Sequence, residues 1–190
     1  MKHLLFLFLI SSMTFPIYAQ YEYEPNADHP FGQLNPEAPE QVADFDPLIG
    51  RSSCSSESRA ADGSWNEPVD MIWTFKYIMN GKAVQDETLK ADGAHSGSIR
   101  QFNADSLKWY VHYYSSSSLP AVLPSWEGTQ TEAGNIVLYR EQAAPSGTEG
   151  FYRLTFSEIS EDGFEWVGEW VNTNETFAYP TWKITCMKSE

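Results

Sequence analysis

Two arginines interrupt apolar stretches whose alternating pattern predicts β-strands. Arg100 lies in "SIRQF" and Arg153 in "FYRLT". A guanidinium that points into a protein interior needs an anionic partner, because an unpaired buried charge is costly. Glu87 in "QDETL" and Glu141 in "YREQ" are candidate partners. An inward arginine would bind a ligand carboxylate through two parallel hydrogen bonds, whereas an outward one would make weak surface ion pairs, and the sequence leaves both open.

One histidine lies within an aromatic stretch of predicted strand. In "WYVHYY", His112 shares a face with Tyr110 and Tyr114. A histidine that lines a cavity can act as acid, base or ligand near neutral pH, although a half-exposed strand position is the simpler interpretation. With Glu87 and an arginine, His112 would form the acid–base set of an isomerase-, cyclase- or lyase-type enzyme. We assign no catalytic residue on this pattern alone.

Aromatic residues are abundant throughout the chain. After Ala19, 24 of the remaining 171 residues are Phe, Trp or Tyr. Such a load is typical of a packed core and also of an aromatic-lined pocket, and both can hold in one domain. Alternation in "MIWTFKYIM" and "FEWVGEW" predicts that Trp73, Trp166 and Trp170 point inward. The segment "YYSSSSLPAVLPSW" at 113–126 is either a lid over a cavity or a loop whose aliphatic residues pack onto the core.

Several function classes lack their motifs. His29, His95 and His112 show no metal-ligand spacing and no cysteine pair accompanies them, so we expect no metal. No Gly-x-Ser-x-Gly elbow and no glycine-rich phosphate loop occur. The formal net charge of −14 disfavours nucleic acid as a partner, because it repels phosphate backbones.

The elements that must position these residues all have the period of β-strands. After Asp44 no stretch shows a helical period, and turn residues such as "NGK" at 80–82 separate most of the apolar segments. Counting from "RSSCSSES", about ten short strands follow one another with short connections. This pattern predicts an all-β fold, a closed antiparallel up-and-down barrel in which the first and last strands pair.

The two cysteines lie near opposite ends of this strand series. Cys54 falls in the first predicted strand and Cys186 in the last, and closure of the barrel would make these strands neighbours. Because the N-terminus predicts export to an oxidising compartment, we expect a Cys54–Cys186 disulfide across the seam rather than two free thiols.

Three regions follow from composition. Residues 1–19 have a basic start, an apolar run and a small residue at Ala19, which predicts a signal peptide and a secreted or periplasmic protein without a transmembrane segment. Residues 20–44 contain six acids, four prolines and no Lys or Arg, which predicts a mobile or loosely docked flexible leader that adds little stability. Residues 45–190 form the predicted barrel domain.

Short segments spread over most of the mature chain resemble a known protein family. They are "FDPLIGRSS", "YIMNGKAVQDET", "GSIRQFNADSLKWYVHYYSS", "GTQTEAGNIVLY", "GFYRLTFSEISEDGFEW" and "PTWKITCMK". They look like an uncharacterised bacterial family of calycin-like, lipocalin-like proteins that is known as a domain of unknown function. The resemblance implies a closed barrel with an internal cavity and no particular reaction.

Departures from related barrels limit what this resemblance implies. Lipocalins begin with a Gly-x-Trp element, whereas Gly50 is followed by Arg51 and Ser52. Nitrobindin-type barrels hold haem through a histidine near the C-terminus, but no histidine follows His112. We therefore expect no haem and no other cofactor.

The sequence favours an exported barrel that binds a small apolar or amphipathic ligand. The alternatives are an enzyme that uses the same cavity, or an interaction module with a filled core. The candidate ligand-binding residues are Trp73, Glu87, Arg100, Tyr110, His112, Arg153, Trp166 and Trp170.

Overall fold

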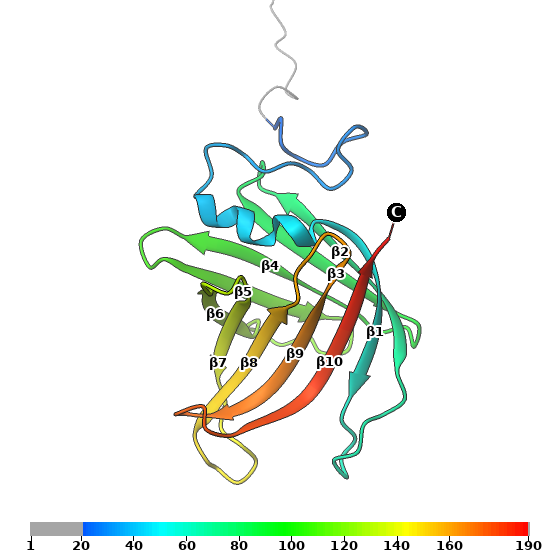
Figure 1. The fold of residues 1–190 in the computed structure, drawn as a ribbon, viewed down its shortest axis with the longest axis vertical. Coiled ribbons are helices and arrows are strands. Elements are labelled where there is room, and N and C mark those ends of the chain that lie inside the picture. Colours follow the sequence, from blue (N-terminus) through cyan, green and yellow to red (C-terminus); the bar gives the residue numbers. More distant parts are fainter. Residues whose placement is uncertain (1–20, 190) are drawn as a thin grey trace, which may run out of the picture.

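A computed structural model describes residues 21–189 of the chain, so the predicted signal peptide lies outside the described residues. Ten antiparallel strands form one closed barrel in which each strand pairs with the next and β1 pairs with β10 (Figure 1). The predicted all-β up-and-down barrel is therefore confirmed. The strands are β1 (Gly50–Ser58), β2 (Val69–Ile78), β3 (Ala83–Lys90), β4 (His95–Asn103), β5 (Lys108–Ser115), β6 (Ser125–Gln130), β7 (Ile136–Glu141), β8 (Gly150–Ser157), β9 (Gly163–Asn172) and β10 (Ala178–Lys188).

The interior of the barrel is built from the alternating residues of the strands. In β2, Met71, Trp73, Phe75 and Tyr77 are all at most 4% exposed, and the residues between them are half-buried or exposed. Successive side chains of a strand point to opposite faces, so this spacing places one apolar set inside the barrel. No helix among residues 21–189 is long and apolar enough to cross a lipid bilayer.

A disulfide joins the strands at which the barrel closes. Cys54 and Cys186 are direct partners in the β1–β10 register, and their Cα atoms are 4.1 Å apart. The predicted disulfide is thus confirmed. It closes a loop of 132 residues, and restricting the unfolded chain in this way contributes about 5 kcal/mol in the chain-entropy model.

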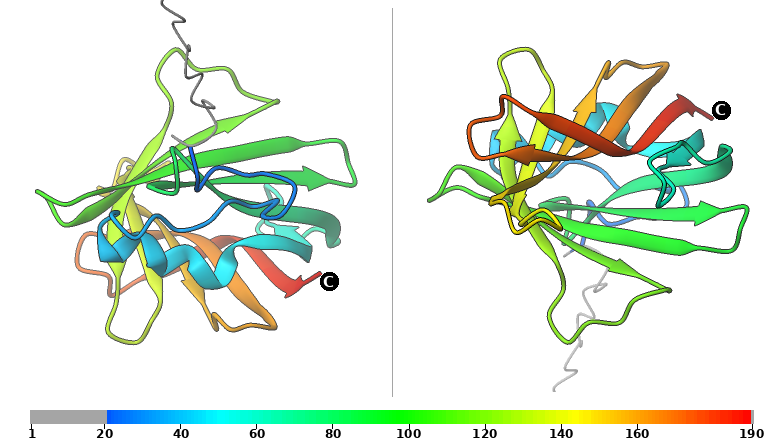
Figure 2. Two further views of the ribbon diagram at one scale, coloured as in Figure 1. Left: turned by 90° about the horizontal axis from the view of Figure 1, so that it is seen from above. Right: turned by 90° about the horizontal axis from the view of Figure 1, so that it is seen from below.

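A 3₁₀-helix closes one end of the barrel. The helix η2 (Glu40–Leu48) lies across the end at which β1 begins and β10 finishes (Figures 1 and 2). The buried face of this helix consists of Val42, Phe45 and Leu48, which are fully inaccessible to solvent. The Phe45 ring packs edge-on against Trp109 with the ring centroids 4.8 Å apart. The domain boundary that we expect at residues 44/45 falls inside this helix.

The chain before the helix is docked on the turn between β2 and β3. The Tyr23 amide donates to Asn80 Oδ1 at 3.0 Å, and the Asn35 amide donates to the Gly81 carbonyl at 3.1 Å. Gly81 has φ of +74°, and a Cβ there would lie 2.3 Å from the Gln33 carbonyl oxygen. Glycine therefore serves both the turn and the close approach of the leader. Of the two arrangements that the sequence allows for residues 20–44, the described part adopts the docked one.

Candidate functional site

A cavity of about 210 Å³ occupies the half of the barrel away from η2. Its walls include Ser96 near the start of β4 and Arg140 near the end of β7, which both lie toward the end that the helix does not cover. Its apolar lining comprises Trp73, Val111, Trp126, Leu154, Trp166, Trp182 and Ile184. Its polar lining comprises Asp86, Thr88, Ser96, Ser98, Arg100, Tyr113, Arg140 and Tyr152.

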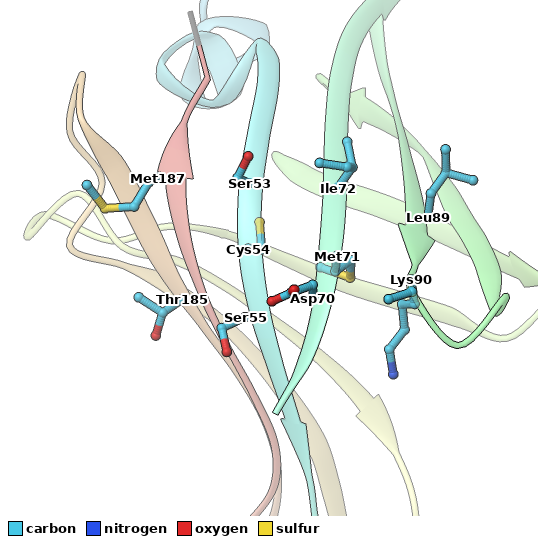
Figure 3. Close-up of a pocket in the computed structure, with 11 residues that line it drawn as sticks. Ser53, Cys54, Ser55, Asp70, Met71, Ile72, Leu89, Lys90, Thr185 and Met187 are labelled. Atoms are coloured by element: carbon cyan, nitrogen blue, oxygen red, sulfur yellow. The ribbon is translucent and has the colours of Figure 1, made fainter. Parts of the chain in front are cut away.

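A larger hollow of about 730 Å³ lies over the seam on the outer wall of the barrel. Figure 3 shows side chains from β10, β1, β2 and β3 around it, among them Ser53, Ile72, Leu89 and Met187. Leu89 and Met187 are 53% and 61% exposed, so this hollow is an open surface groove. Binding sites for small molecules are usually enclosed and have converging polar groups, and the interior cavity fits that description better.

A buried ion pair forms one wall of the cavity. Arg100 Nη1 lies 2.8 Å from Asp86 Oδ1, and both residues are 3% exposed. Ser98 Oγ donates to the same carboxylate oxygen at 2.6 Å, and Trp73 Nε1 donates to Oδ2 at 2.8 Å. Both oxygens of Asp86 are therefore hydrogen-bonded, which offsets the cost of burying the charge.

Three phenyl rings surround the guanidinium of Arg100. Its Cζ lies 5.1 Å from the ring centroid of Phe45, 5.3 Å from that of Phe75 and 5.5 Å from that of Phe156. Burial lowers the pKa of Arg100, and the adjacent Asp86 carboxylate opposes that shift. Arg100 Nε has no hydrogen-bond partner among the described residues. The arginine thus packs between the helix-capped core and the cavity, with its charge balanced by Asp86.

A second arginine lines the cavity without an acidic partner. The Cζ of Arg140 lies 4.3 Å from the centroid of the Trp126 ring, and its Nη2 donates to the side-chain oxygen of Gln142. No carboxylate among residues 21–189 lies within 4.0 Å of it. Burial lowers the pKa of Arg140, and Tyr152 opposes the shift slightly.

Three of the four indoles in the cavity walls donate their N–H group within the protein, with Trp73 donating to Asp86. Trp126 Nε1 donates to the Tyr152 carbonyl at 3.1 Å, and Trp182 Nε1 donates to Ser56 Oγ at 2.8 Å. The Tyr152 hydroxyl lies 2.7 Å from Thr181 Oγ1, and burial raises its pKa, so it stays neutral. The indole rings consequently offer mainly their apolar surfaces to the cavity.

Three of the residues selected from the sequence line this cavity: Trp73, Arg100 and Trp166. Trp170 lies farther along β9 toward the open end, where its Nε1 donates to the Gln142 carbonyl at 2.8 Å and its ring packs 6.2 Å from that of Phe177. It lines a separate hollow near the β7–β8 and β9–β10 connections.

The other four selected residues are not brought to the cavity. Glu87, Tyr110 and His112 alternate with inward residues such as Asp86 and Val111 and therefore lie on the outer face of their strands. Arg153 also lies outside, where it pairs with Glu169 at 2.8 Å and with Glu175. The structure pairs Arg100 with Asp86 instead of Glu87 or Glu141, because Asp86 shares the inward parity of Arg100.

Sequence reasoning missed Arg140, although a signal for it exists. Ile136 and Leu138 are fully buried, and continuing their alternation places Arg140 on the same inner face.

The long loop between β5 and β6 does not follow either expectation for it. Leu119 and Val122 are 90% and 84% exposed, so these residues neither pack onto the core nor line the cavity.

The residues that the structure describes include no cluster of three or more His, Cys, Asp or Glu side chains that would hold a metal ion. The candidate site therefore consists of aromatic walls, one neutralised ion pair and one arginine without an acidic partner.

Comparison with known proteins supports the fold and leaves the family open. No family model and no curated protein matches this chain. Among solved structures, Rv2717c from M. tuberculosis is similar with a TM-score of 0.54 and 12% identity, covering 81% of this chain and 100% of that one. The S-type phycobiliprotein lyase CPES from Guillardia theta matches with a TM-score of 0.49 and 11% identity, covering 77% of this chain and 90% of that one. The likeness to Rv2717c supports the barrel fold seen in the structure, and at 12% identity it concerns the fold alone.

Proposed function

We propose that this protein is exported and binds a small apolar or amphipathic molecule inside its barrel. The observation that carries the proposal is the cavity of about 210 Å³ with the indoles of Trp73, Trp126, Trp166 and Trp182 in its walls. A protein cavity of about 150 Å³ lined by apolar side chains holds benzene, so this volume is large enough for a small organic molecule. The polar groups among the aromatic walls would orient such a ligand.

Export has two supports of its own. Residues 1–19 have the pattern of a signal peptide, and the single disulfide suits an oxidising compartment. N-terminal sequencing of the protein from its own host tests this part, and a mature chain that begins near Gln20 is the expected result.

The enzyme alternative receives no specific support from the site. That alternative relied on Glu87 and His112 as acid and base, and both lie on the outer face of the barrel. The carboxylate inside the cavity, Asp86, already accepts from Arg100, Ser98 and Trp73.

Native mass spectrometry of protein purified from its own host is the first experiment, with a retained small molecule as the expected result. A filled-cavity variant then locates the ligand. Val111→Trp places an indole in the cavity, and Leu154→Trp repeats the test from another strand. Val137→Trp is the control, because Val137 lies on the outer face between the inward Ile136 and Leu138.

Both cavity variants should lose the ligand while keeping the β-sheet circular dichroism of the wild type, and the control should retain it. If folded Val111→Trp and Leu154→Trp bind as well as the wild type, the ligand does not occupy the barrel and the proposal is wrong.

A further inference from the structure

The charges in the cavity wall do not cancel. Asp86, Arg100 and Arg140 are the ionisable Asp, Glu, Lys, Arg or His residues that line it. Asp86 is matched by Arg100 at 2.8 Å, which leaves the positive charge of Arg140 without a carboxylate. The whole chain carries a formal net charge of −14. A net positive cavity inside so acidic a protein is suited to an anionic group of a ligand.

The guanidinium of Arg140 is held in place before any ligand arrives. It stacks on Trp126 at 4.3 Å and donates one hydrogen bond to Gln142. This leaves other N–H donors of the guanidinium for a ligand, and a planar fork of donors matches a carboxylate. Because the group is partly desolvated, a hydrogen bond from it to an anion is stronger than one made in water.

The opposite wall does not repel such a ligand. Both oxygens of Asp86 accept hydrogen bonds from inside the protein, and its charge is neutralised by Arg100. The indoles of Trp73 and Trp166, whose ring centroids are 6.1 Å apart, supply apolar surface beside this ion pair. An anion would therefore bind at the Arg140 side, with its apolar part directed toward these two rings.

The volume limits the size of the ligand. A cavity of about 150 Å³ accommodates benzene, and this one measures about 210 Å³. One aromatic ring with a short acidic chain, or a compact bicyclic acid, is the appropriate scale. We propose that Arg140 binds the carboxylate of a small aromatic monocarboxylic acid whose ring lies among the cavity tryptophans. This inference rests on the proposed ligand-binding function and assigns its ligand class and anchor.

Pairs of ligands that differ only in charge distinguish a failure of the Arg140 inference from a failure of the proposed ligand-binding function. The acids are 3-phenylpropanoate and 2-naphthoate, and each is compared with its neutral primary amide by isothermal titration calorimetry at pH 7, where the acids are ionised. The variants are Arg140→Met, which keeps the length of the side chain without its charge, and Arg140→Lys, which keeps the charge without the planar fork. Arg51→Met on the exposed face of β1 is the control for loss of one positive charge.

We expect the wild type to bind an acid more tightly than its amide. Arg140→Met should weaken the acid by about 10- to 100-fold and change the amide by less than about 3-fold, as for loss of a charged hydrogen bond. Arg140→Lys should fall between the two, and Arg51→Met should match the wild type. Circular dichroism of each variant verifies that the barrel is folded.

Three results would overturn the inference. The first is equal affinity of the wild type for acids and amides. The second is an equal loss of acid and amide in folded Arg140→Met, which would give Arg140 a purely structural role. The third is tight acid binding that survives in Arg140→Met. Under each of these the proposed binding function stands, whereas failure of every acid and amide to bind the wild type at millimolar concentration contradicts the function itself for ligands of this size.

Discussion

The same strands form both halves of the barrel, but the half near η2 is filled by side chains and the other half contains a cavity. At the η2 end, Phe45 packs against Trp109, Phe75 and Phe156, and these rings fill the space. At the other end no helix of residues 21–189 enters, and the cavity remains between the walls. The difference shows that alternation along the strands makes an interior surface, and that an additional element decides whether the interior is solid.

The ion pair of Asp86 and Arg100 lies between the two halves. Arg100 contacts the Phe45 ring on the capped side and lines the cavity on the open side. The pair therefore separates the packed apolar core from the cavity, whose walls include polar side chains. Changes at the two ends should accordingly act on different properties, stability at the capped end and ligand affinity at the open end.

The largest effect should come from removing the ring that fills the capped half. Phe45→Ala should lower the free energy of unfolding by about 3–5 kcal/mol, because it deletes a fully buried aromatic side chain and leaves a void. Denaturant unfolding measures this. Leu119→Ala at the open end is the matched control, and since Leu119 is 90% exposed its effect should stay within about 0.5 kcal/mol. Similar losses in the two variants would contradict the contrast between the ends.

A smaller effect should follow from truncation of the leader. Removal of residues 20–44 deletes Val42, which is fully buried, and Asp44, which accepts a hydrogen bond from Trp109 Nε1 at 2.9 Å. Compared with removal of residues 20–34 alone, this should cost about 2–3 kcal/mol more, mainly from the lost burial of Val42 and that hydrogen bond.

The sequence predicts that the leader adds little stability, and thermal unfolding of the two truncations tests that prediction. Midpoints of both truncations that equal that of the chain beginning at Gln20 would favour it, because residues 20–44 would then contribute little to the capped end.

The smallest effect concerns pH at the capped end. Burial raises the pKa of Asp44 above its usual value of 3.8. The folded state therefore holds the proton more strongly than the unfolded state, so Asp44 makes the protein less stable as the pH rises from 3.8 through the folded pKa. Asp44→Asn should flatten this part of the stability profile while its amide oxygen still accepts from Trp109.

Chemical unfolding at a series of pH values gives the profile, and Asp105→Asn at an exposed turn is the control. A profile of Asp44→Asn that is parallel to that of the wild type would mean that Asp44 has an ordinary pKa in the folded protein.

Much of the fold could be predicted because it depends on local pattern. Period-two alternation in β2 and β9 and turn residues such as Gly81 are readable along the chain. Chain order then places the first strand beside the last in a closed meander, which is why the pairing of Cys54 with Cys186 could be predicted from the sequence.

The candidate site was predicted only in part, because a polar residue on a strand does not reveal which face is inside. Arg100 and Arg153 look alike in the sequence, yet one is buried beside Asp86 and the other pairs with Glu169 on the outer wall. His112 shows the same ambiguity, since its aromatic neighbours suit either face. Arg140 was missed because its role depends on Trp126, which comes from a neighbouring strand.

Periodicity, turn chemistry and chain order can be read along the chain, and they predict the class of fold, the order of the strands and the disulfide. Three features of the interior could not be predicted in this way: Phe45 fills one half of the barrel, Asp86 neutralises Arg100, and Arg140 remains beside the cavity without a carboxylate. They depend on charge balance and packing, for which side chains from distant strands must meet in one small interior. Those meetings are set by register and closure of the barrel, which no single stretch of the sequence contains.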